Sequence, residues 1–136
     1  MPSLKRQFGD MGEDLAANLL VRKGYKILDR NFSQKWGEID IVAKKWEGRD
    51  EHKKEALVFV EVKTIKGKGS PEQLALAGGN VHYAKQQRLI RTAKSYLAKH
   101  RISPGVGWQI DVVAVALDPE TNTARVEHLE NAVWGR

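Results

Sequence analysis

The sequence predicts an α/β fold in which a mixed β-sheet is flanked by helices. Apolar residues recur at helical spacing over residues 5–23 and 81–100. Short runs rich in β-branched and aromatic residues predict strands at 25–28, 38–43, 57–64, 108–117 and 125–129. Helices that alternate with strands in this order pack against the faces of one sheet.

Composition indicates a single globular domain, residues 1–136, with 41% hydrophobic and 29% charged residues. The chain has no cysteine, which excludes disulfides, zinc–thiolate sites and a cysteine nucleophile and fits a cytoplasmic location. No stretch approaches the roughly 20 apolar residues of a membrane span, so we expect no membrane association. A net charge of +6 favours a polyanionic partner, above all nucleic acid.

The first helix is amphipathic. Phe8, Met11, Leu15 and Leu19 form its apolar stripe, and Gly24 follows as a stop signal. Glu13 projects about a third of a turn from the centre of that stripe, since each residue advances by ~100°. We therefore expect Glu13 to reach toward a buried site.

Two neighbouring strands carry the charged residues of interest. In 38–43, we expect Glu38 and Asp40 to share one face, with Ile39 and Ile41 on the other. The segment 57–64 is apolar on both faces, as in an interior strand, but Glu61 and Lys63 interrupt it on one face. The polar segment 44–55 contains the turn signal Gly48-Arg49-Asp50, which predicts an antiparallel hairpin that brings Asp40 toward Glu61.

The rest of the chain contains one long connection. Residues 65–80 hold four glycines and Ser70-Pro71, so we expect a flexible loop beside the site, with at most a helical turn at 74–76. After the helix at 81–100, Ser103-Pro104-Gly105 breaks the chain before the last two strands. Trp108 is expected to open the first of these as a core residue.

Two acids and a lysine are what metal-assisted phosphodiester hydrolysis requires. Magnesium keeps several waters and takes one or two protein carboxylates, so Asp40 and Glu61 suffice to anchor it, with the Val62 carbonyl as a third oxygen. Lys63 would orient or polarise the attacking water. The bland alternative is that Asp40 ends a strand while Glu61 and Lys63 form a surface ion pair of little energetic value.

Motifs along nearly the whole chain resemble a known family. A helix with Glu13, a strand ending at Asp40 and then Glu61-Val62-Lys63 resemble the PD-(D/E)xK nuclease superfamily. More closely, the chain resembles the YraN family in the phrases Gly12-Glu13, Gly24-Tyr25, Arg30-Asn31, Gly37-Glu38-Ile39-Asp40-Ile41, Phe59-Val60-Glu61-Val62-Lys63-Thr64 and Asp111-Val112-Val113. The chain departs from the superfamily in one position, since Ile39 stands where the first motif has proline, and 44–55 is long for the family.

This resemblance implies a restriction-endonuclease-like fold similar to that of archaeal Holliday-junction resolvases. It also implies a metal-dependent endonuclease site built from Asp40, Glu61 and Lys63, with Glu13 as an accessory acid. Mg²⁺ is the expected cofactor, and Mn²⁺ an expected substitute.

Four further residues are candidates for nucleic-acid binding. Lys85 and Arg88 belong, with Arg91 and Lys99, to a cationic helix face suited to phosphates, although a surface helix also shows such a face. Gln86, at the edge of the apolar face, could touch the scissile phosphate or a metal-bound water, and the alternative is a glutamine that is satisfied within the protein or faces solvent. Trp36, next to the Asp40 motif, could stack on a base.

The preferred interpretation is a metal-dependent endonuclease that cuts structured or branched DNA. The alternative is a nucleic-acid-binding accessory protein that keeps the nuclease fold but is non-catalytic or activated by a partner. A third interpretation is an interaction module in which the acids are structural. The sequence leaves open DNA versus RNA, and whether two copies pair as a homodimer.

Overall fold

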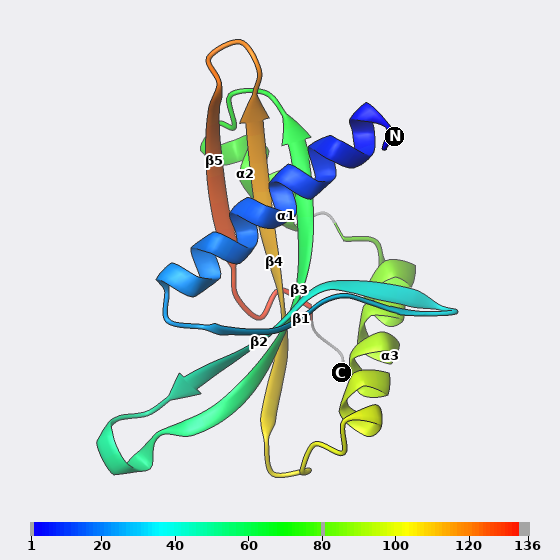
Figure 1. Ribbon diagram of the computed structural model, residues 1–136, viewed down its shortest axis with the longest axis vertical. Coiled ribbons are helices and arrows are strands. Elements are labelled where there is room, and N and C mark those ends of the chain that lie inside the picture. Colours follow the sequence, from blue (N-terminus) through cyan, green and yellow to red (C-terminus); the bar gives the residue numbers. More distant parts are fainter. Residues whose placement is uncertain (1, 80, 134–136) are drawn as a thin grey trace.

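The computed structural model describes residues 2–79 and 81–133, and it contains one five-stranded sheet with helices on both faces (Figure 1). The helices are α1 (Leu4–Arg22), the short 3₁₀ helix η1 (Asp50–His52), α2 (Pro71–Gly79) and α3 (Tyr83–Lys99). The strands are β1 (Lys26–Gln34), β2 (Gly37–Glu47), β3 (Lys54–Lys66), β4 (Gly107–Asp118) and β5 (Thr123–Leu129). The predicted α/β class is confirmed.

Strand order in the sheet follows chain order, β1-β2-β3-β4-β5. The pair β3–β4 is parallel and the other three pairs are antiparallel, so the sheet is mixed as predicted. The chain crosses from β3 to β4 through α2 and α3, because parallel neighbours need a long connection. The predicted hairpin between Asp40 and Glu61 is confirmed as β2–β3, with η1 in its tip.

Helix α1 covers one face of the sheet and crosses β3 and β4 in Figure 1. Ser3 caps its first turn by accepting a hydrogen bond from the Arg6 N–H at 3.1 Å. Ala16 and Leu20 are fully buried against Val58 and Val60 of β3. The small side chain of Ala16 lets the helix lie close to the sheet.

Helix α3 covers the opposite face. Leu89, Ala93 and Tyr96 pack with Phe59 of β3 and Ile110 of β4 in a second core cluster. The central strands β3 and β4 are therefore apolar on both faces, as the sequence indicated for 57–64. Among the described helices, none is long and apolar enough to cross a membrane.

Residues 65–80, predicted as a flexible loop, contain the helix α2 instead. Ser70 and Gln73 exchange hydrogen bonds between side chain and backbone at 3.2 and 3.0 Å, which is a capping box, and Pro71 follows at the first helical position. Leu74 is buried against β4, and Gly78 lies against Leu129 of β5. The prediction of a loop was wrong because it gave more weight to the glycines of this segment than to the capping box. Asn80 lies outside the described residues.

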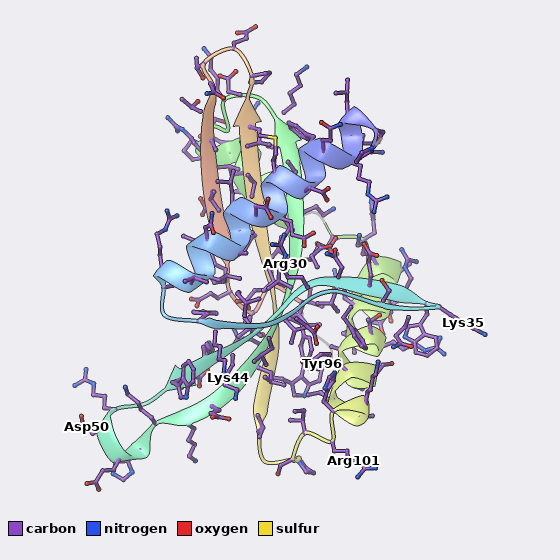
Figure 2. The ribbon with its side chains drawn as sticks, in the orientation of Figure 1. Arg30, Lys35, Lys44, Asp50, Tyr96 and Arg101 are labelled. Carbon is purple, nitrogen blue, oxygen red and sulfur yellow. The ribbon has the colours of Figure 1, made fainter. Side chains whose placement is uncertain are left out.

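The first strand is longer than the predicted 25–28. It runs to Gln34, and the pair Gln34–Gly37 closes a tight hairpin with β2. This hairpin extends past α3, and Lys35 lies at its tip (Figure 2). Consequently β1 flanks the part of β2 that contains Asp40.

The two isoleucines that flank Asp40 face opposite sides of the sheet, contrary to the prediction. Ile39 belongs to the core cluster under α3, whereas Ile41 belongs to the cluster under α1. At the same level of the neighbouring strand β1, Asn31 has a φ of 57°, which departs from extended backbone. The pairs Arg30–Ile41 and Phe32–Ile39 form on either side of this irregularity.

Candidate active site

Asp40 lies where β2 separates from β3. The β2–β3 ladder ends at the pair Ile41–Val60, so the next edge of β3 is left without a strand partner on that side. The Asp40 carboxylate takes that place, and its Oδ2 accepts a hydrogen bond from the Val62 N–H at 2.7 Å. Because the N–H and C=O of one strand residue point to the same side, the Val62 carbonyl faces the same opening.

A pocket of about 540 Å³ opens at this point between α1, β2 and β3. Asp40, Glu38 and Glu13 line it, together with Val62, which confirms that Glu38 and Asp40 share a face. Cationic Lys5 and Arg6 from the start of α1, and Asn31 and Thr64, complete its wall.

Glu13 is buried but already paired. Its Oε1 accepts hydrogen bonds from Arg30 Nε at 3.0 Å and Asn31 Nδ2 at 3.2 Å. Arg30 also reaches Asp14 at 2.8 Å, and it lies between α1 and the hairpin in Figure 2. Glu13 thus reaches the Asp40 pocket as predicted, with its negative charge compensated.

Glu61 and Lys63 emerge on the other face of β3. They follow Leu57 and Phe59, which pack under α3, at strand spacing. Glu61 is 6% exposed, and its Oε1 accepts a hydrogen bond from Lys85 Nζ of α3 at 2.7 Å. Lys63 is half-buried, and its side chain makes no hydrogen bond or ion pair within the part of the chain that the structure describes.

The charge of Glu61 reaches Asp40 across the strand edge. Burial, followed by repulsion from Glu61, raises the pKa of Asp40 from its ordinary value near 3.8 to about 7. The Val62 N–H opposes this rise, while Glu13 and Glu38 add smaller contributions to it. The structure therefore brings three predicted acids near Asp40: Glu13 and Glu38 in the pocket and Glu61 from the other face.

The four residues predicted to bind nucleic acid differ in their availability. Lys85 is engaged with Glu61, and Gln86 Nε2 donates to the Val81 carbonyl at 2.7 Å. The Arg91 guanidinium covers the Trp36 ring at 4.1 Å from its centroid, so one stacking face of this ring is occupied. Arg88 is exposed on the same helix. Their roles in binding stay predictions.

The profile described as "Uncharacterised protein family UPF0102" matches residues 12–115. The chain belongs to this family. A UPF0102 protein from Roseiflexus castenholzii is 36% identical over 133 residues, which cover 98% of each chain. Another, from Chloroflexus aurantiacus, is 41% identical over 115 residues, or 85% of this chain and 83% of the relative. The predicted YraN-like family membership is confirmed.

Among solved structures, one described as MspJI restriction endonuclease in complex with a 27-mer oligonucleotide is similar to this UPF0102 chain. The match covers 85% of this chain and 21% of that chain, at 18% identity and a TM-score of 0.34. The expected similarity to archaeal resolvases stays a prediction.

The UPF0102 chain contains a second buried acid that received no site role from the sequence. Asp111 of β4 is fully buried, and its Oδ1 accepts hydrogen bonds from the Asn131 N–H at 2.7 Å and Gln109 Nε2 at 2.8 Å. Its Oδ2 lies 2.7 Å from His128 Nε2 on β5. The signal was present, since Asp111 interrupts an apolar strand as Glu61 does.

Asp111, His128 and Glu130 have potential metal-ligand atoms within 4.8 Å of one another. However, Lys23 Nζ lies 2.7 Å from His128 Nδ1. An ammonium group only donates, so Nδ1 accepts and the Nε2–H donates to Asp111. Both ring nitrogens of His128 are therefore engaged by protein groups, and the network ties β4 to the chain after β5.

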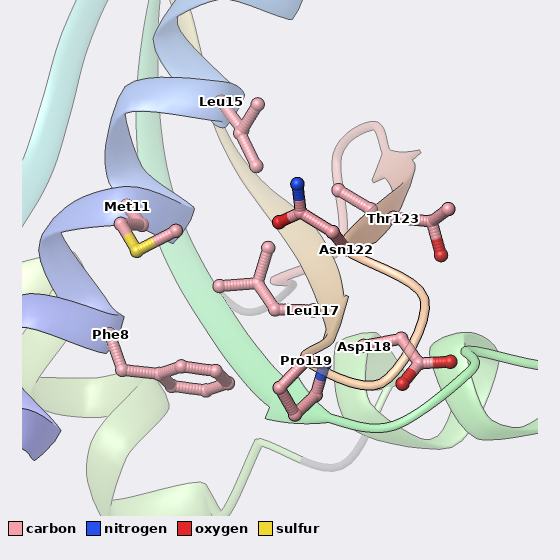
Figure 3. A pocket seen from close by; sticks show the side chains of 9 residues that line it. Phe8, Met11, Leu15, Leu117, Asp118, Pro119, Asn122 and Thr123 are labelled. Atoms are coloured by element: carbon pink, nitrogen blue, oxygen red, sulfur yellow. The ribbon is translucent and has the colours of Figure 1, made fainter.

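An apolar pocket of about 370 Å³ separates α1 from the β4–β5 turn in this UPF0102 chain. Figure 3 shows Phe8, Met11 and Leu15 of α1 facing Leu117 and Pro119 across it. Asp118 and Asn122 are polar residues at its rim. None of the candidate acids lines this pocket, although Phe8 lines both it and the Asp40 opening.

Proposed function

We propose that this protein is a metal-dependent endonuclease whose site is built on Asp40 and Glu61. The observation that carries the proposal is the approach of a half-buried carboxylate, Asp40, and a buried one, Glu61, at the point where β2 leaves β3. Burial of Asp40, followed by repulsion from Glu61, raises the pKa of Asp40 to about 7. Mutual repulsion of this kind is costly for folding and is typical of a site that binds a cation.

The donor set fits a hard divalent cation such as Mg²⁺, with Mn²⁺ as a substitute. Asp40 supplies a carboxylate and lines the opening together with Val62, whose carbonyl faces it, while the Glu61 carboxylate approaches from the other face of β3. Oxygen ligands with one or two carboxylates are what magnesium prefers. When bound, such an ion would stabilise charge on a phosphate and help to generate a nucleophile from water.

The chain's own residues then have separate tasks. Lys63 is the cation without an internal partner among the described residues near Glu61, so it is suited to orient water or hold a phosphate oxygen. Glu13 and Glu38 add negative charge to the pocket, while Lys5 and Arg6 at its wall attract a polyanion. Arg88 and Lys85 provide further positive charge on α3.

Nucleic acid is the proposed substrate, in keeping with the net charge of +6. The resemblance of Glu13, Asp40 and Glu61-Val62-Lys63 to the PD-(D/E)xK superfamily favours phosphodiester hydrolysis. Within that superfamily, the resemblance to Holliday-junction resolvases favours structured or branched DNA. A homodimer would place two such sites on one substrate, and we include it in the proposal.

The test is nicking of single-stranded, duplex and branched DNA and of RNA in Mg²⁺ or Mn²⁺. We expect Asp40→Asn and Lys63→Ala to lower the rate by about 100-fold or more, since they remove a metal ligand and a cationic group at the reacting phosphate. Glu51→Gln, an exposed acid in η1, is the matched control and should cut like the wild type.

Unchanged nicking in Asp40→Asn and Lys63→Ala would contradict the proposal. Salt-sensitive DNA binding without cleavage, which survives chelation and Lys63→Ala, would instead support the accessory protein.

A further inference from the structure

The ion pair between Lys85 and Glu61 joins a partly exposed cation to a buried, proposed metal ligand. Glu61 has a side chain that is 7% exposed, whereas that of Lys85 is 42% exposed. Lys85 lies in the first turn of α3, which is anchored on the sheet by Leu89 and Ile90. Its backbone is therefore held while its long side chain can turn from the carboxylate toward solvent.

Lys85 and a metal ion would compete for Glu61. The Lys85 ammonium lies 2.7 Å from Glu61 Oε1, and magnesium binds carboxylate oxygens at about 2.0–2.1 Å. Two cations this close repel strongly in a partly buried site. A divalent ion at Glu61 therefore weakens or displaces the ion pair.

Once displaced, the Lys85 ammonium needs another hydrogen-bond acceptor. It carries three hydrogen-bond donors and no acceptor, so away from Glu61 it is satisfied by water or by a phosphate oxygen. Two other cations are held elsewhere, since Arg30 pairs with Glu13 and Asp14 and Arg91 lies on Trp36, whereas the Lys63 side chain has no partner within the described residues. Lys85 is thus the cation whose release depends on what Glu61 binds.

We propose that Lys85 couples metal binding to nucleic-acid binding by exchanging Glu61 for a backbone phosphate. The proposal rests on the proposed function, because it takes Glu61 as a metal ligand. A phosphate that draws Lys85 away leaves Glu61 free for the metal, and a metal on Glu61 releases Lys85 for the phosphate. By linkage, each ligand then strengthens the binding of the other to the same degree.

The first experiment measures Mn²⁺ binding by calorimetry without nucleic acid. We expect Lys85→Gln and Lys85→Met to bind Mn²⁺ on the order of tenfold more tightly than the wild type, because no ammonium competes for Glu61. Lys94→Gln removes an equal charge from an exposed position on the same helix and should change the affinity by less than about twofold. Lys85→Gln keeps a hydrogen-bond donor for Glu61, so a variant that folds is available.

The second experiment measures the coupling directly, in a Lys63→Ala background that prevents cleavage. Anisotropy of a fluorescein-labelled DNA duplex gives its affinity at increasing Mn²⁺ concentrations. Mn²⁺ should strengthen DNA binding on the order of tenfold with Lys85 present, and clearly less with Lys85→Gln. Lys94→Gln should retain the coupling of the parent.

The outcomes separate the two proposals. Equal Mn²⁺ affinity in the wild type and both Lys85 variants, or equal coupling in Lys85→Gln and its parent, would overturn the role of Lys85. Failure of every protein to bind Mn²⁺, or binding that is unaffected by Asp40→Asn, would overturn the proposed metal site itself.

Discussion

Two acids in one sheet, the fully buried Asp111 and the half-buried Asp40, have opposite surroundings. Both carboxylate oxygens of Asp111 are engaged, one by the Asn131 N–H and Gln109 and the other by His128. Asp40 receives one hydrogen bond, from the Val62 N–H, and faces the negative charges of Glu61, Glu13 and Glu38. The Asp111 carboxylate has its hydrogen-bond partners within the protein, whereas Asp40 is surrounded by other carboxylates.

This difference separates a structural acid from a functional one. A buried charge that has its full set of donors stabilises the arrangement around it. A buried charge among like charges destabilises the fold unless a cation binds there, and Asp40 additionally lines an open pocket. Burial alone therefore does not identify a site, whereas the balance of donors and like charges does.

The largest expected effect is at the satisfied acid. Asp111→Ala should lower the free energy of unfolding by about 3–5 kcal/mol, because it leaves the Asn131 N–H and His128 without their partner. Urea denaturation followed by circular dichroism measures this change. Stability within about 1 kcal/mol of the wild type would remove the contrast between the two acids.

Asp40 should show the opposite behaviour in metal-free buffer. Folded Asp40 keeps its proton to about pH 7, whereas the unfolded chain releases it near 3.8, so the folded state binds more protons between these values. Its contribution is fully present below about pH 4 and is lost as the pH rises through 7, on the order of 4 kcal/mol at most.

Asp40→Asn should remove this pH-dependent loss and be as stable as the wild type, or more stable, at pH 8. Urea denaturation from pH 4 to 8 measures the slope of stability against pH for both proteins. A mutant that keeps the wild-type slope would show that Asp40 is not the group responsible.

The smallest expected effect concerns the close contact between β3 and α1, the helix that carries Glu13. A Cβ on Gly12 would collide with Oγ1 of Thr64 and lie 3.0 Å from its Cβ and Cγ2, so Gly12→Ala should lower stability by about 1–3 kcal/mol. Gly9, on the same helix, has nothing within 4 Å of such a Cβ. Gly9→Ala should raise stability by up to about 1 kcal/mol through helix propensity. Thermal unfolding compares them, and equal effects would show that α1 does not rest closely on β3.

The two central strands show which features of the buried acids could be predicted from the sequence. Glu61 and Asp111 each interrupt an apolar strand, so the sequence marked both as unusual buried acids. The partners that distinguish them come from far along the chain: Lys85 on α3 for Glu61, and His128 and Asn131 for Asp111. No local pattern contains such partners, and so Asp111 received no role.

Near Asp40, a single backbone irregularity changed the expected geometry. Alternation predicted Ile39 and Ile41 on one face, but the left-handed conformation of Asn31 on the neighbouring strand accompanies a change of face between them. Strand periodicity assumes a regular ladder on both sides, and β2 leaves β3 at this residue.

The sequence by itself determined the amphipathic helices, the interior strand and the hairpin that brings Asp40 to Glu61, because these depend on spacing along the chain. The tertiary structure alone decided which acids are compensated, since this depends on donors and charges that folding brings together. It placed Lys85 on Glu61 and left Asp40 under the repulsion of its neighbours. That electrostatic imbalance distinguishes the candidate site from the rest of the buried sheet.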